Sequence, residues 1–293
     1  MHAARALGQA PAHAGKDRDI GGLVSNNLGE YLPVPVTGRG VTYRVLPQNG
    51  PQREILLAAL PGAGIGRVIM PGTSVGEEPA VLEIAARYDF IHAAAGVHPH
   101  YTASPADLSA LEGYLRDAAR HKIVAVGECG LDYFQAEGYP PPDRAAQKEL
   151  FDAQLCLAER YKLPVIIHSR DAHADCLDIL RARKGITRGV FHCFSGDVEL
   201  VKTLAGMGVY MSFTGAVTYK KNAALREAAT AVPRDLLMAE TDAPYLAPEP
   251  HRGKRCDSTM LVPILAALAA ARGEAPEETE SLTWDNAARF FEV

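Results

Sequence analysis

The chain has 293 residues, of which 47% are hydrophobic and 22% are charged, and its formal net charge is −5 at pH 7. This apolar content is enough to bury a large core, and the acidic balance excludes a broadly basic protein that coats nucleic acid. Five scattered cysteines without Cys-x-x-Cys spacing exclude a disulfide framework, and no apolar stretch has the length of a membrane span. We therefore expect one soluble, cytoplasmic main domain.

The first 63 residues differ from the rest of the sequence. The beginning is rich in alanine with weak periodicity, and proline and glycine interrupt residues 33–40. We predict an atypical N-terminal segment at residues 1–63, which includes the first strand at either residues 19–24 or residues 41–46. Residues 54–60 are predicted to form a helix that leads into the next strand.

From residue 64 to residue 293, short β-branched runs alternate with segments whose apolar residues repeat at helical spacing. Seven runs are predicted strands, at residues 67–70, 90–95, 123–127, 164–167, 189–191, 209–213 and 236–241. The predicted helices are at residues 108–120, 150–161, 172–183, 198–207, 261–272 and 278–291. With one strand upstream, this is the count of an α/β fold of the TIM-type (β/α)8 barrel class.

Four residues that commonly bind metals lie at or just past the ends of predicted strands: Glu128, His168, His192 and Asp242. Each alone has an ordinary explanation, since a glutamate can cap a helix, an aspartate can start a turn, and a buried histidine is usually hydrogen-bonded. In a barrel, however, all strand C-termini meet at one face. An open doubly wound sheet is the alternative, but it gathers its ligands at one switch point rather than after four strands. The four residues therefore predict a divalent-metal site.

Five segments, in this order along the chain, resemble a known family. They are Ala-Gly-Val-His-Pro-His at 95–100, Val-Ala-Val-Gly-Glu-Cys-Gly-Leu-Asp-Tyr at 124–133, the segment 154–170 that ends in Ile-His-Ser-Arg, His-Cys-Phe-Ser-Gly at 192–196, and Glu-Thr-Asp-Ala-Pro-Tyr-Leu at 240–246. Together they resemble the TatD family of metal-dependent deoxyribonucleases, within the amidohydrolase-like barrels. The resemblance covers about residues 64–293.

The resemblance implies a metal-dependent deoxyribonuclease that acts as an exonuclease. It implies that Glu128 bridges or shares the metal and takes part in catalysis, and that His168 and His192 bind the metal. Asp242 would both approach the metal and serve as the base. Many relatives end their first strand with a His-x-His pair, and no such pair precedes residue 98 here. The expected cofactor is accordingly one or two divalent metal ions.

The residue types also suit phosphodiester hydrolysis in their own right. A divalent cation makes water more acidic and neutralises the phosphoryl oxygens, and Asp242 would take the proton from the attacking water. Carboxylate and imidazole ligands together accept Mg²⁺, Mn²⁺ or Zn²⁺. The low basicity of the chain suits an enzyme that grips only a few phosphates. The expected partner is therefore DNA, as a single strand or a frayed end.

Several basic side chains are candidate substrate contacts, because a guanidinium offers paired donors to a phosphate. The candidates are His98, His100, Arg170, Arg252 and Arg255. The ordinary alternatives are turn formation beside Pro99 for the histidines and surface solvation or an ion pair for the arginines. The pair Lys220 and Lys221 is either a loop contact or a solvated pair.

Fold and metal ligands do not by themselves choose a substrate. One alternative function is a metal-dependent hydrolase of a small ester, amide or lactone, which a closed apolar pocket at the barrel mouth would favour. The other is a degenerate, non-catalytic barrel, which predicts little affinity for divalent metals.

Overall fold

The computed structural model describes residues 40–43, 50–134, 143–183 and 188–293. All of these residues belong to one compact unit, Val36–Val293. Within the described ranges, no helix is both long enough and apolar enough to cross a bilayer. The domain boundary expected at residue 63 stays a prediction.

Eight parallel strands form the sheet in the described part of the chain, and each strand pairs with the next one along the sequence. The strands are β1 (Gly40–Tyr43), β2 (Ile65–Pro71), β3 (Ile91–Ala95), β4 (Ile123–Asp132), β5 (Val165–Arg170), β6 (Gly189–Phe191), β7 (Tyr210–Phe213) and β8 (Leu237–Ala239). Because the order is the order of the chain, every connection crosses to the neighbouring parallel strand.

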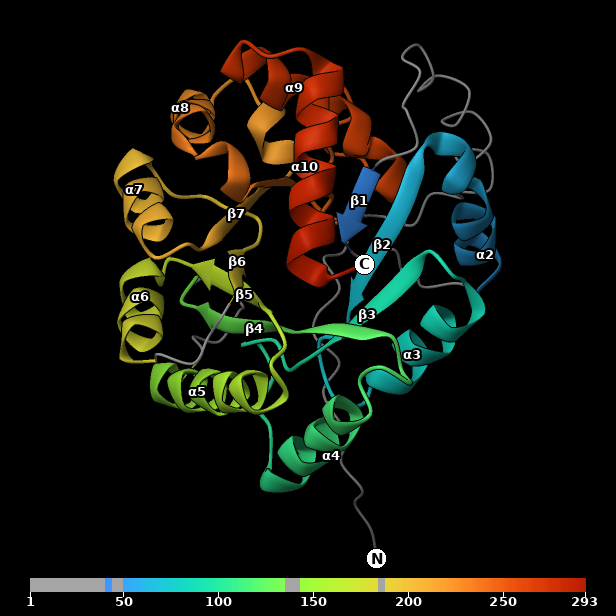
Figure 1. The fold of residues 1–293 in the computed structure, drawn as a ribbon, viewed down its shortest axis with the longest axis vertical. Helices are drawn as coiled ribbons and strands as arrows, with labels where there is room; N and C mark the ends of the chain where they lie inside the picture. The colour runs from blue at the N-terminus through green and yellow to red at the C-terminus, as the bar shows by residue number, and fades with distance from the viewer. Residues whose placement is uncertain (1–39, 44–49, 135–142, 184–187) are drawn as a thin grey trace, which may run out of the picture. The chain divides into compact units, whose positions relative to one another are not determined.

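A helix follows every strand. The helices are α2 (Gly50–Ala59), α3 (Glu78–Arg87), α4 (Pro105–Arg116), α5 (Arg144–Tyr161), α6 (His173–Ala182), α7 (Val198–Gly206), α8 (Ala223–Ala231), α9 (Leu261–Arg272) and α10 (Pro276–Phe291). Figure 1 shows the strands inside a ring of helices, and α10 contacts both β1 and β8. The predicted (β/α)8 barrel is therefore confirmed.

The strands are apolar on both faces because each lies between the barrel interior and the helices. In β5, Val165, Ile166 and Ile167 are at most 1% exposed. Parallel strands covered on both sides are typically uninterrupted apolar runs, which is the pattern that the sequence shows. Several helices begin at side-chain caps, such as the capping box of Ser104 and Asp107 at the start of α4.

All seven strands predicted after residue 63 are present, and the differences lie at their ends and in two helices. β1 overlaps the predicted alternative at residues 41–46, whereas residues 19–24 lie outside the described residues. β4 continues to Asp132 instead of ending at Gly127. The helices α3 and α8 were not predicted. The apolar pattern of α8 is weak, because this helix buries only two alanines.

Candidate metal centre

Glu128 lies at an irregularity within β4. The pairing of β4 with β5 shifts register between Val126 and Cys129, so that Gly127 and Glu128 lie in a bulge. Gly127 has a φ of 142°, and a Cβ at this position would lie 2.7 Å from the carbonyl oxygen of Ile166. Only glycine allows β5 to come this close, and the bulge redirects the neighbouring glutamate side chain.

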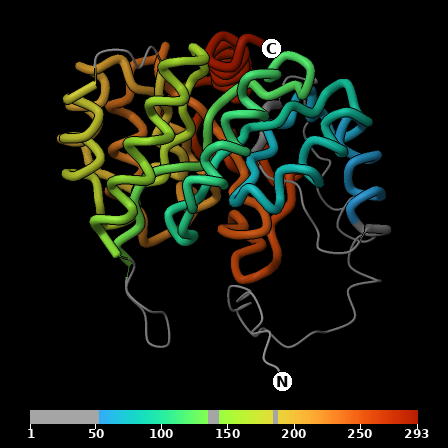
Figure 2. Tube along the Cα trace, turned by 90° about the horizontal axis from the view of Figure 1, so that it is seen from below, coloured from blue at the N-terminus to red at the C-terminus, as the bar shows by residue number. Residues whose placement is uncertain are grey.

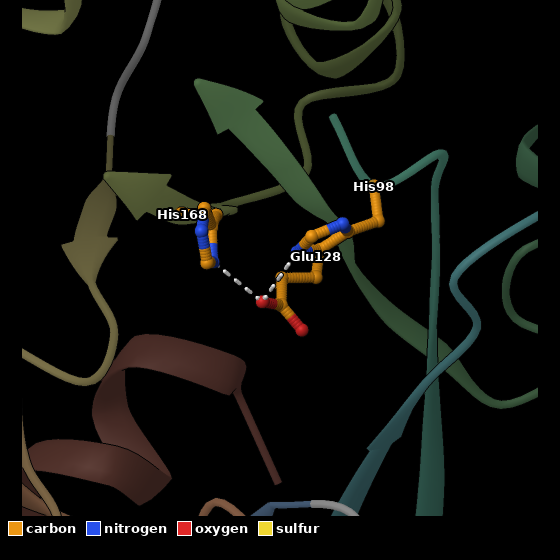
Figure 3. Close-up of side chains that lie close together, drawn as sticks. All are labelled: His98, Glu128 and His168. Atoms are coloured by element: carbon orange, nitrogen blue, oxygen red, sulfur yellow. Dashed lines mark hydrogen bonds and ion pairs between the residues drawn. The ribbon is translucent and has the colours of Figure 1, made fainter. Parts of the chain in front are cut away.

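Three imidazoles surround one oxygen of the Glu128 carboxylate. Its Oε1 lies 2.7 Å from His192 Nε2, 2.9 Å from His168 Nδ1 and 3.5 Å from His98 Nε2. The ligand atoms of His98, Glu128 and His168 all lie within 4.8 Å of one another, and Figure 3 shows these three side chains converging. His98 follows the end of β3, and Glu128 and His168 lie in the C-terminal halves of β4 and β5, so the barrel topology brings them together.

Asp132, at the end of β4, extends this cluster. The side chain is buried, and its Oδ2 lies 2.6 Å from His100 Nε2 and 3.1 Å from His168 Nε2. Burial by itself would raise the pKa of this carboxyl, but the hydrogen bonds with His100 and His168 outweigh burial and hold the pKa below its ordinary value. His168 therefore lies between two carboxylates, Glu128 and Asp132.

The electrostatics of the cluster suit a cation. Burial tends to lower the pKa of His168 and His192, yet the pKa of both imidazoles is raised, because Glu128 contacts both rings and Asp132 also contacts His168. The carboxylates thus create a negative potential at the ring nitrogens, in a buried space that is lined by imidazole nitrogen and carboxylate oxygen. These are the ligand types that bind Mn²⁺ and Zn²⁺, so the residues present fit a divalent metal ion.

Asp242 lies past the end of β8, outside the group formed by His98, Glu128 and His168. Its neighbour Glu240 accepts a hydrogen bond from the backbone N–H of Cys193 at 2.6 Å. Burial, and then the negative charges of Asp242 and Glu240, raise the pKa of the Cys193 thiol. The segment after β8 that carries Asp242 therefore begins next to the segment after β6 that carries His192, because Glu240 contacts both Cys193 and His192.

Of the remaining predicted contacts, the two histidines lie at this cluster, and the arginines lie on β5 and on the segment between β8 and α9. His98 lies within the candidate metal group, and His100 contacts it through Asp132. Arg170 stacks on Phe134 with 3.6 Å between the guanidinium carbon and the ring centroid. Arg252 and Arg255 are exposed on the segment between β8 and α9.

Two buried glutamines of α5 hold the segments that carry this cluster. Gln154 accepts a hydrogen bond from the Val97 N–H at 2.7 Å and donates one to the Val97 carbonyl at 2.9 Å. Gln147 binds the N–H and the carbonyl of Asp132 in the same way, at 2.8 and 3.0 Å. The glutamines are two helical turns apart, so they lie on one side of α5. One helix thus fixes both Asp132 and the segment before His98.

Gln154→Leu should lower the free energy of unfolding by about 2–6 kcal/mol, because it leaves the N–H and the carbonyl of buried Val97 unpaired at about 1–3 kcal/mol each. Urea unfolding followed by circular dichroism measures the change. The matched control is Glu149→Leu at an exposed position of the same helix, which should change stability by no more than about 0.5 kcal/mol. Equal stability of the two variants would contradict the role assigned to Gln154.

Glu78, at the start of α3, is a fully buried carboxyl that contacts the segment before His98. Its Oε1 accepts a hydrogen bond from the N–H of Gly96 at 3.0 Å. Burial raises the pKa of Glu78 to about 8, and this hydrogen bond only partly opposes the effect. The carboxyl therefore keeps its proton at neutral pH in the folded protein.

The free energy of unfolding should fall by about 4 kcal/mol as the pH rises from about 5 to about 9, relative to Glu78→Gln. The sign follows because the folded state holds the Glu78 proton up to a pKa of about 8, whereas the unfolded chain releases it near the ordinary value of 4.5. Urea unfolding at both pH values tests the difference. Parallel pH profiles of the parent protein and Glu78→Gln would show that Glu78 does not titrate as stated.

Comparison with known proteins places this geometry in a family. The family model described as TatD related DNase matches residues 47–292. An uncharacterized metal-dependent hydrolase of Escherichia coli K12, YcfH, is 43% identical over 200 residues, which are 68% of this chain and 72% of the relative. The 3'-5' ssDNA/RNA exonuclease TatD of Cronobacter sakazakii is 37% identical over 247 residues, which are 82% and 91% of the two chains.

A solved structure agrees with the sequence relatives. The crystal structure of YjjV, a TatD homologue from Escherichia coli K12, superimposes with a TM-score of 0.81 at 31% identity and covers 87% of this chain and 98% of that chain. The fold, the carboxylate and imidazole cluster and the matched length therefore agree. The chain belongs to the TatD family, and it is a metal-dependent hydrolase that acts on ester bonds.

Proposed function

We propose that this hydrolase is an exonuclease that shortens single-stranded DNA or RNA from the 3' end. The observation that carries the proposal is the convergence of His98, His168 and His192 on one oxygen of Glu128 at the C-terminal face of the barrel. The relative from Cronobacter sakazakii that is named as a 3'-5' ssDNA/RNA exonuclease supports the substrate class and the polarity.

In this proposal, Glu128, His168, His192 and Asp242 hold the metal, and His98 lies close enough to share in binding it. When bound, the metal supplies positive charge that neutralises the phosphoryl oxygens and acidifies water. Asp242 accepts the proton of the attacking water; what supports this role is a carboxylate two residues after Glu240, whose Oε2 lies 3.8 Å from His192 Nδ1. The substrate contacts are His100, Arg170, Arg252 and Arg255.

The proposed exonuclease also fits a reducing compartment. All five cysteines are free thiols, and Cys156 is exposed. Exposed thiols persist in the cytoplasm because glutathione and thioredoxin keep them reduced there. A cytoplasmic location is therefore part of the proposal.

The decisive experiment is digestion of an end-labelled single-stranded oligonucleotide by metal-stripped protein, with Mg²⁺, Mn²⁺ or Zn²⁺ added back. Metal-dependent shortening from the 3' end is expected, and Glu128→Ala should not cleave under any of the three ions. Metal binding without cleavage would redirect the assignment to a small ester, amide or lactone. Neither binding nor cleavage would favour a non-catalytic barrel.

A further inference from the structure

Basic and aromatic side chains gather on the segments that follow β7 and β8. Tyr245 is 55% exposed, and only one other large hydrophobic side chain of the described residues, Ile55, is exposed. The exposed cations of these segments are Lys220, Lys221, Arg252, Lys254 and Arg255. The segment between β8 and α9 projects from one end of the unit in Figure 2. We call this set, with Tyr219, the β7–β8 loop surface.

The two segments form one fixed surface. The Tyr219 hydroxyl donates to the carbonyl of Ala247 at 3.0 Å, and the N–H of Glu249 donates to Thr218 Oγ1 at 2.8 Å. The Arg226 guanidinium donates to the Tyr219 carbonyl at 2.7 Å. A backbone that is held from two sides presents its exposed cations in defined positions, which lowers the entropy cost of binding a ligand.

The lysines of this surface differ from many surface cations in this protein. In the part of the chain that the structure describes, Lys220, Lys221 and Lys254 form no ion pair with a carboxylate. By contrast, Arg160 on α5 pairs with a glutamate, and Arg234 pairs with two glutamates at 2.7 Å each. A cation that forms no ion pair remains available to attract an anionic ligand. The acidic chain thus carries five exposed cations on these two segments.

Arg252 lies over the Tyr219 ring, with its guanidinium carbon 4.5 Å from the ring centroid. Stacking of this kind orients the guanidinium plane and leaves the N–H groups at its edge available as donors. Tyr245 belongs to the same turn as Asp242, the proposed base, because the N–H of Tyr245 donates to the Asp242 carbonyl at 2.7 Å. Tyr245 is thus the exposed aromatic residue that lies nearest in the chain to Asp242.

We infer that the β7–β8 loop surface binds the part of a single strand that adjoins the bond being cut. This inference rests on the proposed exonuclease function and extends it. An unpaired base stacks on the exposed Tyr245 ring, while Lys220, Lys221, Arg252 and Lys254 contact backbone phosphates. Proteins commonly bind single strands by stacking bases on aromatic rings that lie among cationic side chains. A duplex offers no unpaired base for such stacking, because its bases stack on one another.

Fluorescence anisotropy of the metal-loaded protein with a short labelled single strand, made with hydrolysis-resistant phosphorothioate linkages, tests the inference. Tyr245→Ala should weaken binding about 5- to 150-fold, and Tyr245→Phe should restore it because the ring is retained. The double variant Lys220→Ala/Lys221→Ala should reduce the slope of log affinity against log salt by about 0.7 for each phosphate that is no longer neutralised. The control Lys148→Ala/Lys202→Ala removes the same charge from cations that are paired on outer helices and should keep the parent slope.

Several results would overturn the inference. Tyr245→Ala that binds like the parent, or a lysine variant with the parent salt slope, would show that the surface does not bind the strand. Equal binding of a duplex, with an equal decrease in Tyr245→Ala, would exclude base stacking. Failure of the exonuclease proposal alone gives a different result. The parent would then bind the strand, Tyr245→Ala and the lysine double variant would change that binding as stated, and an unmodified strand would remain uncut.

Discussion

Asp242→Asn should lower kcat for an end-labelled single strand by about 10²- to 10⁴-fold, which is the contribution typical of a general base. The change keeps the size and one oxygen of the side chain but removes its basicity. The fold and most of the metal affinity should persist, because the other proposed ligands, Glu128, His168 and His192, are unchanged and lie in contact with one another. Single-turnover hydrolysis and titration calorimetry with Mn²⁺ measure the two quantities separately.

Glu249→Gln is the matched control for Asp242→Asn, since it removes one negative charge from the same segment after β8. It should retain nearly the parent kcat. If Asp242→Asn also kept the parent kcat, Asp242 would not be the base. If Asp242→Asn instead lost most of its Mn²⁺ affinity, the residue would act mainly as a metal ligand.

The largest decrease in metal affinity is expected for Glu128→Gln. Removing a group that only hydrogen-bonds a metal ligand typically costs about 10- to 100-fold in metal affinity, so removing the charge of the central carboxylate should cost more. The reason is that Glu128 Oε1 places negative charge next to three imidazoles at once, where a cation would bind. Calorimetric titration of metal-stripped protein with Mn²⁺ measures the change.

A second variant tests whether the loss of Mn²⁺ affinity in Glu128→Gln comes only from the change in net charge. It removes one carboxylate charge from an outer helix. Glu112→Gln breaks an ion pair between α4 and α5 and should bind Mn²⁺ like the parent. His168→Ala and His192→Ala should each lower the affinity as well. A histidine variant with the parent affinity would remove that residue from the set of ligands.

The order of strands and the convergence of Glu128, His168 and His192 could be predicted because both follow from simple patterns. Parallel strands buried on two faces are apolar runs, and the topology then carries their last residues to one face. Asp132 was missed because the glycines at 127 and 130 interrupt the apolar run, although in the fold they let β4 continue close to β5. If a strand is allowed to continue past such glycines, Asp132 becomes a strand-end carboxylate like the other candidates.

Gln154 shows a different limit of sequence reasoning. It lies on the buried face of α5, where the helical spacing alone predicts a core position. The sequence does not show that the buried amide pairs with the backbone of Val97, because that partner is 57 residues away. A polar residue at a predicted core position is nevertheless a usable signal, since buried polar groups are nearly always hydrogen-bonded.

The spacing of Gln147 and Gln154 limits how this chain can change in length. One residue inserted or deleted between them would turn one amide about 100° around the helix axis relative to the other. Either Val97 or Asp132 would then lack its partner, whatever the identity of the inserted residue. Evolution and protein engineering can therefore substitute exposed residues between the two glutamines, such as Glu149, but cannot add or remove one, because α5 sets the separation between the ends of β3 and β4.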